Sequence, residues 1–125
     1  MKIEIGGGLA LWPGFTNLDP AHGEGEFRRR AEDGPWPLAD CSVEAGRASH
    51  VLEHVAARTD RLAVFSEMWR VLVPGGTFEI IVPLFSAANP VGALADPTHR
   101  SLWIKESFEY FTGQRQAAAT YAMPL

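Results

Sequence analysis

Hydrophobic and polar residues alternate along several short segments of the chain, which is the pattern of β-strands. At the start of the chain, Ile3 and Ile5 alternate with charged residues, and "TFEIIVP" near the middle has the strongest strand pattern of all. The predicted strands are Lys2–Ile5, Phe15–Leu18, Glu44–Ser49 and Thr77–Pro83. Within the last of these, the unbroken apolar run Ile80–Val82 predicts burial on both faces of a sheet.

Apolar residues recur every three or four positions between Arg61 and Leu72, which is the spacing of one helix face. The residues expected on this face are Leu62, Phe65, Met68, Trp69 and Leu72. The run Pro74-Gly75-Gly76 predicts the end of the helix, because proline removes a backbone donor and glycine permits a turn. A helical turn or two is expected after His50, and a short helix over Lys105–Phe111.

The connections between these elements differ in kind. The first two strands are so close in sequence that little room is left between them for a crossover helix. The segment Glu26–Ala31 is either a third strand or a charged connection, since its periodicity favours neither. Leu84–Arg100 contains two prolines and a glycine, and we expect a long loop there.

Strands that alternate with helices predict an α/β fold, with a mostly parallel sheet and helices on both faces. Ligands of such sheets bind at the carboxyl ends of the strands. Gly6–Gly8, Asp19 and Ser49-His50 each follow a predicted strand, so we expect them to gather along one edge of the sheet.

The composition narrows the class of protein. The chain has 125 residues, which suits a single domain over 1–125, and its net charge of −4 argues against nucleic-acid or anionic-membrane partners. Cys41 is the only cysteine, which excludes an internal disulfide and cysteine-rich zinc sites. No stretch approaches a membrane span and no signal peptide is recognisable, so we expect a cytoplasmic location.

The glycine run and the aspartate together indicate a ligand. Glycines after a strand let ligand atoms approach the backbone, and a carboxylate at the end of the neighbouring strand can accept both hydroxyls of a ribose. Without a crossover helix after Gly6–Gly8, however, a diphosphate would lack the helix N-terminus that binds it best. The sequence therefore predicts a nucleoside ligand that has a ribose and no phosphate.

Five segments in this order resemble the small class I S-adenosylmethionine-dependent methyltransferases. They are "KIEIGGG…PGFTNLDP", "GPWPLADCSVE", "ASHVLEHV", "MWRVLVPGGTFEIIVP" and "DPTHRSLWIKESFEYFTG". The resemblance covers about Lys2–Gly113 and is narrower still to a bacterial and phage-type subgroup with a shortened first helix. It implies a Rossmann-like fold, S-adenosylmethionine as the cofactor, and methyl transfer to an acceptor that the sequence does not identify.

The same resemblance assigns cofactor-binding roles residue by residue. Asp19 would take the ribose, Ala31-Glu32 would contact adenine, and Ser49 and His50 would lie beside the methionyl group and the reaction centre. The residues assigned to the methionine-side loop are Glu4, Gly6, Gly7 and Gly8. The chain departs from the pattern at Ala31, where many relatives have an aspartate, and at Gly46-Arg47, which fall inside a strand expected to be apolar.

The catalytic assignments are His50 and His99. His99 lies in "DPTH", on the loop that covers the acceptor in this fold, and could act as a general base; alternatively, the stretch organises the loop through Asp96. Trp36 either lies over adenine or anchors a turn. The aromatic residues expected to serve packing are Trp103, Phe108, Tyr110 and Phe111.

Two other functions fit parts of the sequence. "HVLEH" matches the H-x-x-E-H motif of one metallopeptidase class, in which His50 and His54 would share a helix face and hold zinc, with Glu67 as the nearest third ligand. This hypothesis leaves the glycine turn and Asp19 unexplained, so we expect no metal site.

The other alternative is a non-catalytic S-adenosylmethionine-binding scaffold. Only Gln114–Leu125 remains for the C-terminal strand pair with which the family fold normally finishes, so the domain could lack that pair. An exposed sheet edge would then favour a homodimer. The expected acceptor is a small molecule, a sugar or a protein side chain.

Overall fold

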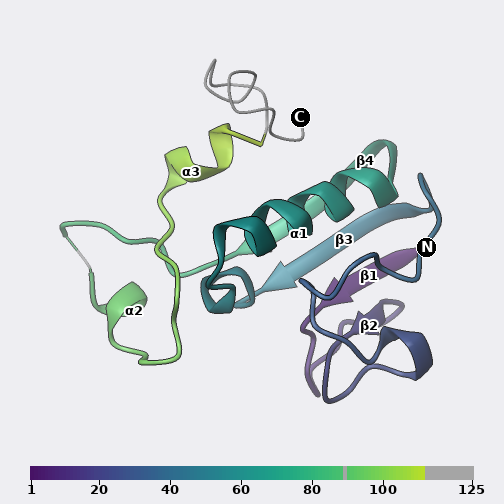
Figure 1. The fold of residues 1–125 in the computed structure, drawn as a ribbon, viewed down its shortest axis with the longest axis horizontal. Helices are drawn as coiled ribbons and strands as arrows, with labels where there is room; N and C mark the ends of the chain where they lie inside the picture. Colours follow the sequence, from purple (N-terminus) through teal and green to yellow (C-terminus); the bar gives the residue numbers. More distant parts are fainter. Residues whose placement is uncertain (89, 112–125) are drawn as a thin grey trace.

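The computed structural model describes residues 1–88 and 90–111, and these build an α/β fold around one parallel sheet (Figure 1). The strands are β1 (Lys2–Ile5), β2 (Thr16–Leu18), β3 (Val43–Ser49) and β4 (Leu72–Ile81). The helices are the 3-10 turns η1 (Gly25–Phe27) and η2 (Leu52–His54), and α1 (Arg58–Val71), α2 (Val91–Leu94) and α3 (Lys105–Glu109). The strand order is β2-β1-β3-β4, and every pair is parallel.

The short first connection is confirmed. No helix lies between β1 and β2; the glycine turn is followed by an irregular loop that returns directly to the sheet. The open question over Glu26–Ala31 is also resolved, because η1 and irregular backbone occupy this stretch and no strand forms. The expected C-terminal segment Gln114–Leu125 lies outside the described residues.

Helix α1 packs with one face on the sheet, and this buried face is in part the one that we predicted. Phe65 and Met68 are buried as expected, together with Val64 and Val71. The prediction for Trp69 is wrong. Its side chain is 63% exposed, because the helix face that packs on the sheet includes Val64 and Val71 instead. The helix ends at Val71, before the predicted proline-glycine stop.

Among residues 1–88 and 90–111, β4 is the last strand at its side of the sheet, and this corrects its predicted burial. Its burial alternates along the strand, and Ile81 in the apolar run is 37% exposed. Side chains at Phe78 and Ile80 point toward α1, while Glu79 and Ile81 at the alternate positions are exposed. Burial on both faces would require a further covering layer over β4.

The unusual pair Gly46-Arg47 has a structural explanation in β3. A Cβ at Gly46 would overlap the ring of Phe78 on the neighbouring strand, so any other residue would force that ring to move. Arg47 lies on the opposite face, where its guanidinium donates to Glu4 Oε1 at 2.6 Å and to Glu79 Oε2 at 2.8 Å. The sheet is therefore tied across three strands at this point and is not loosened.

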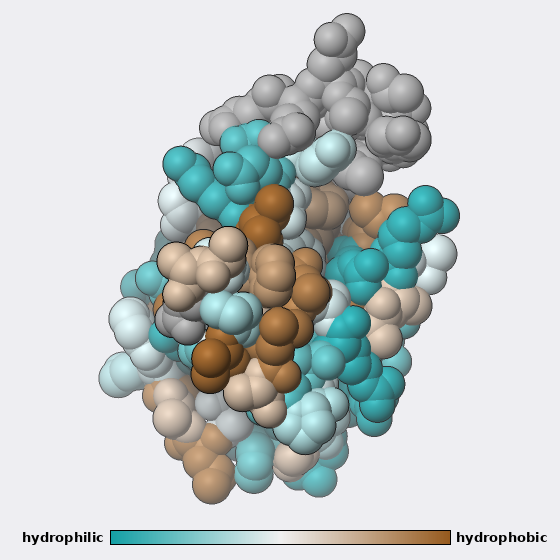
Figure 2. All heavy atoms as spheres, turned by 90° about the vertical axis from the view of Figure 1, so that its left-hand side faces the viewer, coloured by the Kyte–Doolittle hydropathy of each residue, from teal (hydrophilic) through white to brown (hydrophobic). Residues whose placement is uncertain are grey.

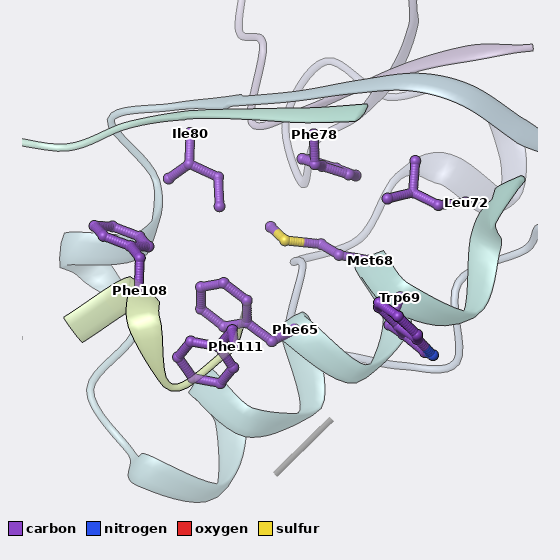
Figure 3. Close-up of a pocket in the computed structure, with 8 residues that line it drawn as sticks. All are labelled: Phe65, Met68, Trp69, Leu72, Phe78, Ile80, Phe108 and Phe111. Atoms are coloured by element: carbon purple, nitrogen blue, oxygen red, sulfur yellow. The ribbon is translucent and has the colours of Figure 1, made fainter. Parts of the chain in front are cut away.

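Aromatic side chains close the far end of α1, as predicted. Trp103 is buried and packs on Phe65 and Phe108, with ring centroids 5.9 and 5.2 Å apart, and Phe111 stacks on Phe65 at 3.7 Å. Beside them an apolar cavity of about 410 Å³ lies between α1, β4 and α3 (Figure 3). Within the described residues, no helix has the length and hydrophobicity needed to span a bilayer.

Candidate functional site

The glycine turn after β1 forms the centre of the candidate site, and its backbone donors are all in use. The N–H of Gly6 donates to Leu18 O at 2.8 Å, that of Gly7 to Asn17 Oδ1 at 3.0 Å, and that of Gly8 to Asp19 Oδ2 at 3.2 Å. A phosphate group needs free backbone donors of this kind. The turn therefore suits a ligand without phosphate, as the sequence indicated.

Gly6 is required by its backbone and by its neighbour. Its φ is +62°, in the left-handed region, and an ideal Cβ would lie 2.6 Å from Cγ2 of Val51. Val51 comes from the segment after β3, so this close approach brings the ends of β1 and β3 together. Gly8 also has a positive φ, of +55°, but no atom lies within 4 Å of the position of its Cβ.

Asp19 lies beside the turn, and its carboxylate already has three partners. Oδ1 accepts the N–H groups of Ala21 at 2.8 Å and His22 at 2.7 Å, and Oδ2 accepts that of Gly8. Burial on its own would raise the pKa of Asp19, but the N–H groups of His22, Ala21 and Gly8 together outweigh it and hold the pKa below its usual value. In this geometry Asp19 fixes the turn, and its capacity to accept ribose hydroxyls is largely used.

A cavity of about 450 Å³ opens at the carboxyl edge of the sheet, next to Gly6. Its walls include Ala31 and Glu32, both assigned to adenine, and the rim carries His54 and Thr98. Its apolar lining comes from Ile5, Leu18, Val51 and Val55. The structure thus brings Gly6, Ala31 and Glu32 together around one hollow.

The other predicted cofactor residues do not line this cavity. The residues outside it are Glu4, Gly7, Gly8, Asp19, Ser49 and His50. Gly8 borders a separate hollow of about 820 Å³ between the loop after β1 and η1. Glu4 is buried and engaged elsewhere: Oε1 pairs with Arg47 at 2.6 Å and Oε2 accepts the N–H of Trp12 at 3.1 Å, so it holds the loop that covers this side of the sheet.

Comparison with known proteins agrees with the fold. Residues 16–80, which are more than half of the chain, match the family described as methyltransferase domain. The chain belongs to the methyltransferase domain family. The fold is similar to that of the YcgJ protein from Bacillus subtilis, with a TM-score of 0.64 and 18% identity over 90% of this methyltransferase domain. The match covers 59% of the YcgJ chain, and a comparison with curated proteins found no match.

The segment after β3 corrects the metallopeptidase hypothesis for this methyltransferase domain. His50 has a φ of +55° and only Leu52–His54 form a helical turn, of the 3-10 type, so His50 and His54 do not share an α-helix face. Glu67, the suggested third ligand, is bound at another place by Arg70 and by the N–H of Trp36. The peptidase geometry is therefore wrong.

His99 lies on a loop that Asp96 organises. Asp96 Oδ1 accepts the N–H and the hydroxyl of Thr98 at 2.8 and 2.7 Å, as the structural alternative for "DPTH" predicted. The Thr98 hydroxyl and N–H hold the pKa of Asp96 below its usual value. The His99 ring is nearly buried and points toward Glu53 and His54, not into the cavity beside Gly6.

Sequence reasoning missed part of this site. His54 and Thr98 line the cavity, whereas the predicted catalytic residues His50 and His99 do not. The "HVLEH" and "DPTH" motifs contain all four residues, so the signal was present, but their meeting depends on a contact between two distant segments. Trp36 is a buried anchor, since its indole N–H donates to Ala31 O at 2.8 Å.

Proposed function

We propose that this chain is an S-adenosylmethionine-dependent methyltransferase domain whose cofactor binds in the cavity beside Gly6. The observation that carries the proposal is the cavity itself. It lies at the carboxyl edge of a parallel sheet, has a volume typical of small-molecule sites, and is bordered by a turn whose N–H groups are all used internally. An adenosine that carries no phosphate fits these conditions.

The residues present fit such a cofactor. Gly6 leaves space where any side chain would collide with Val51, and Ala31 and Glu32 offer a wall for adenine, in which Ala31 adds little steric bulk. Ile5, Leu18, Val51 and Val55 offer the cofactor apolar contacts, and the polar side chains in the same lining, such as Asp60 and Arg100, offer hydrogen-bonding groups. S-adenosylmethionine supplies a methyl group on a sulfonium, so the protein's contribution is mainly to position an acceptor in line with it.

The surface around the loops after β4 favours an acceptor that has an apolar part. Exposed apolar side chains gather on the face that carries α2 and its flanking loops (Figure 2). They are Leu84, Phe85, Val91, Leu94, Leu102 and Ile104. Contiguous exposed apolar surface commonly marks a binding site. A hydrophobic small molecule or an apolar peptide segment agrees with this surface better than a free sugar does.

A pair of neighbouring alanines provides the test. Ala56 and Ala57 are both exposed, but only Ala56 lines the cavity. Titration calorimetry with S-adenosylmethionine and S-adenosylhomocysteine should show binding to the wild type, about tenfold or greater loss for Ala56→Trp, and no loss for Ala57→Trp. The proposal fails if neither ligand binds at millimolar concentration or if both variants bind like the wild type.

Methyl transfer to a broad acceptor panel then separates an enzyme from a non-catalytic cofactor-binding scaffold. The scaffold remains the second candidate because β4 is the last strand of the sheet in the described part of the chain. Binding without turnover of any acceptor in the panel would favour it.

A further inference from the structure

The buried carboxylate of Glu53 has no hydrogen-bond partner among the described residues and lies close to His54 and His99. The Glu53 side chain is 1% exposed, and neither of its carboxylate oxygens has a hydrogen-bond partner among the described residues. His50 Nδ1 approaches Oε1 at 3.3 Å without hydrogen-bonding geometry. Burying a carboxylate in this way is unfavourable unless a cation or a proton compensates it.

The position of Glu53 is fixed by the backbone around it. Its carbonyl oxygen accepts the N–H groups of Arg100 at 2.6 Å and Ser101 at 3.0 Å, and the Ser101 hydroxyl donates to Leu52 O at 3.0 Å. These bonds join the turn after β3 to the loop that follows "DPTH". The carboxylate and the His99 ring, 46 positions apart in sequence, are therefore held together by the fold.

His54 and His99 can each offer a ring-nitrogen lone pair to a cation. His54 Nδ1 lies 3.0 Å from Thr98 O, and His99 Nδ1 lies 3.0 Å from Ala93 O. A carbonyl oxygen can only accept, so Nδ1 carries the proton in each ring, and in the neutral imidazole Nε2 is free to bind a cation. Histidines that bind metals usually donate their other ring nitrogen in this way.

The donor atoms are close enough for one ion. One ligand atom from each of Glu53, His54 and His99 lies within 4.8 Å of the others, and His99 Nε2 is 4.0 Å from Glu53 Oε1. Donors bound to zinc at about 2.1 Å lie roughly 3–4 Å apart, so small side-chain movements would close the set. His54 is exposed, which leaves an entry path for the ion.

We propose that Glu53, His54 and His99 form a binding site for a divalent transition-metal ion, such as Zn²⁺ or Co²⁺. One carboxylate and two imidazoles are a ligand set that these ions accept, with coordination positions left open. His54 also lines the cavity beside Gly6, so an ion held there would lie near that cavity. If the proposed function holds, the ion would be a Lewis acid that could polarise an acceptor oxygen near the cofactor; metal binding itself does not depend on that function.

Metal titration of tag-free, metal-stripped protein tests the site. Calorimetry with Zn²⁺ and visible absorption with Co²⁺ should show about one ion per chain in the wild type, and roughly tenfold or greater weakening in Glu53→Gln and in His99→Asn. His22→Asn is the matched control, because His22 lies outside the cluster; its metal binding should equal that of the wild type. No binding by the wild type, or equal binding by all four proteins, would overturn the proposal.

Two further measurements keep the outcome clear. Circular dichroism of each metal-free variant checks its fold, and His54→Asn replaces any variant that does not fold in the metal titration alone, because His54 lines the cavity. S-adenosylhomocysteine binding, measured on the same metal-free samples, tests the proposed function separately, because Glu53 and His99 do not line the cavity. Metal binding with no cofactor binding would retain the metal site and reject the proposed function; the reverse would reject the metal site alone.

Discussion

Replacing Asp19 with asparagine should reveal what its carboxylate does. The side chain is 7% exposed and accepts three backbone N–H groups, at 2.7, 2.8 and 3.2 Å. An asparagine side chain at this position would keep one oxygen for Ala21 and His22, but its amide N–H₂ would face the N–H of Gly8. The turn after β1 would lose one charge-assisted bond, and the other two would weaken.

The expected loss is large for a single polar substitution. A hydrogen bond to a charged group contributes about 1.5–3 kcal/mol, so losing one and weakening two should lower the free energy of unfolding by about 2–3 kcal/mol. Whole domains are stable by roughly 5–15 kcal/mol. With a urea m-value of about 2 kcal/mol/M, the unfolding midpoint at pH 7 should fall by about 1 M.

The pH dependence has a definite sign. The pKa of Asp19 in the folded protein lies below its usual value of 3.8. Its stabilisation is therefore fully present above that value and is lost as the pH falls through the lower folded pKa. Urea unfolding of the wild type at a series of pH values should show this loss, and the Asp19→Asn curve should be flatter in the same acidic range.

Asp40→Asn is the matched control for this experiment. Asp40 is exposed and makes no bond to the turn; it pairs with Arg70 at 2.8 Å near the start of β3. A surface pair of this kind contributes about 1 kcal/mol or less. If Asp19→Asn shifts the midpoint no more than Asp40→Asn but weakens S-adenosylhomocysteine binding, Asp19 is a ribose ligand and our interpretation of its three bonds is refuted.

Three other predictions concern the frame around the site. The Arg70 guanidinium and the N–H of Trp36, at 2.7 Å, lower the pKa of Glu67 despite its burial. Glu67→Gln should therefore lower the free energy of unfolding by about 1–2 kcal/mol at pH 7, and that free energy should depend less on pH in the acidic range than in the wild type. Glu44→Gln, at an exposed position, should unfold in urea like the wild type. Gly6→Ala should be more destabilising than Gly25→Ala by about 1 kcal/mol or more, since both have positive φ but only the first would meet Val51; equal losses would contradict this. Light scattering should show dimers at high concentration through the edge of β4, which no strand of the described residues pairs, and a monomer throughout would reject that contact.

The strands and the glycine turn could be predicted because their signals are local. Alternation at Ile3 and Ile5 and the glycines after them need only neighbouring residues to be interpreted. The exposure of Ile81 could not, since it depends on β4 being the last strand of the described sheet. Trp69 failed for a related reason: helix periodicity gives a stripe, but only packing decides which side of the stripe faces the strands.

The site itself was predicted less completely than the fold. Asp19 was placed at the correct edge, yet whether its oxygens are free depends on backbone groups that no spacing rule reports. The meeting of Glu53 with His99 requires the loop after β4 to return to the end of β3, a contact between distant segments. Arg47 looked like a flaw in β3 until β1 and β4 supplied its two carboxylate partners.

A substitution at Gly46 would change the size of the apolar cavity between α1, β4 and α3. One side of the Phe78 ring packs against Gly46 of β3, and Phe78 also lines this cavity (Figure 3). The methyl group of Gly46→Ala would push the Phe78 ring toward the cavity. The cavity would then become smaller although none of its lining residues had been replaced. The size of a ligand that the cavity accepts would thus depend on Gly46, a residue that does not line it.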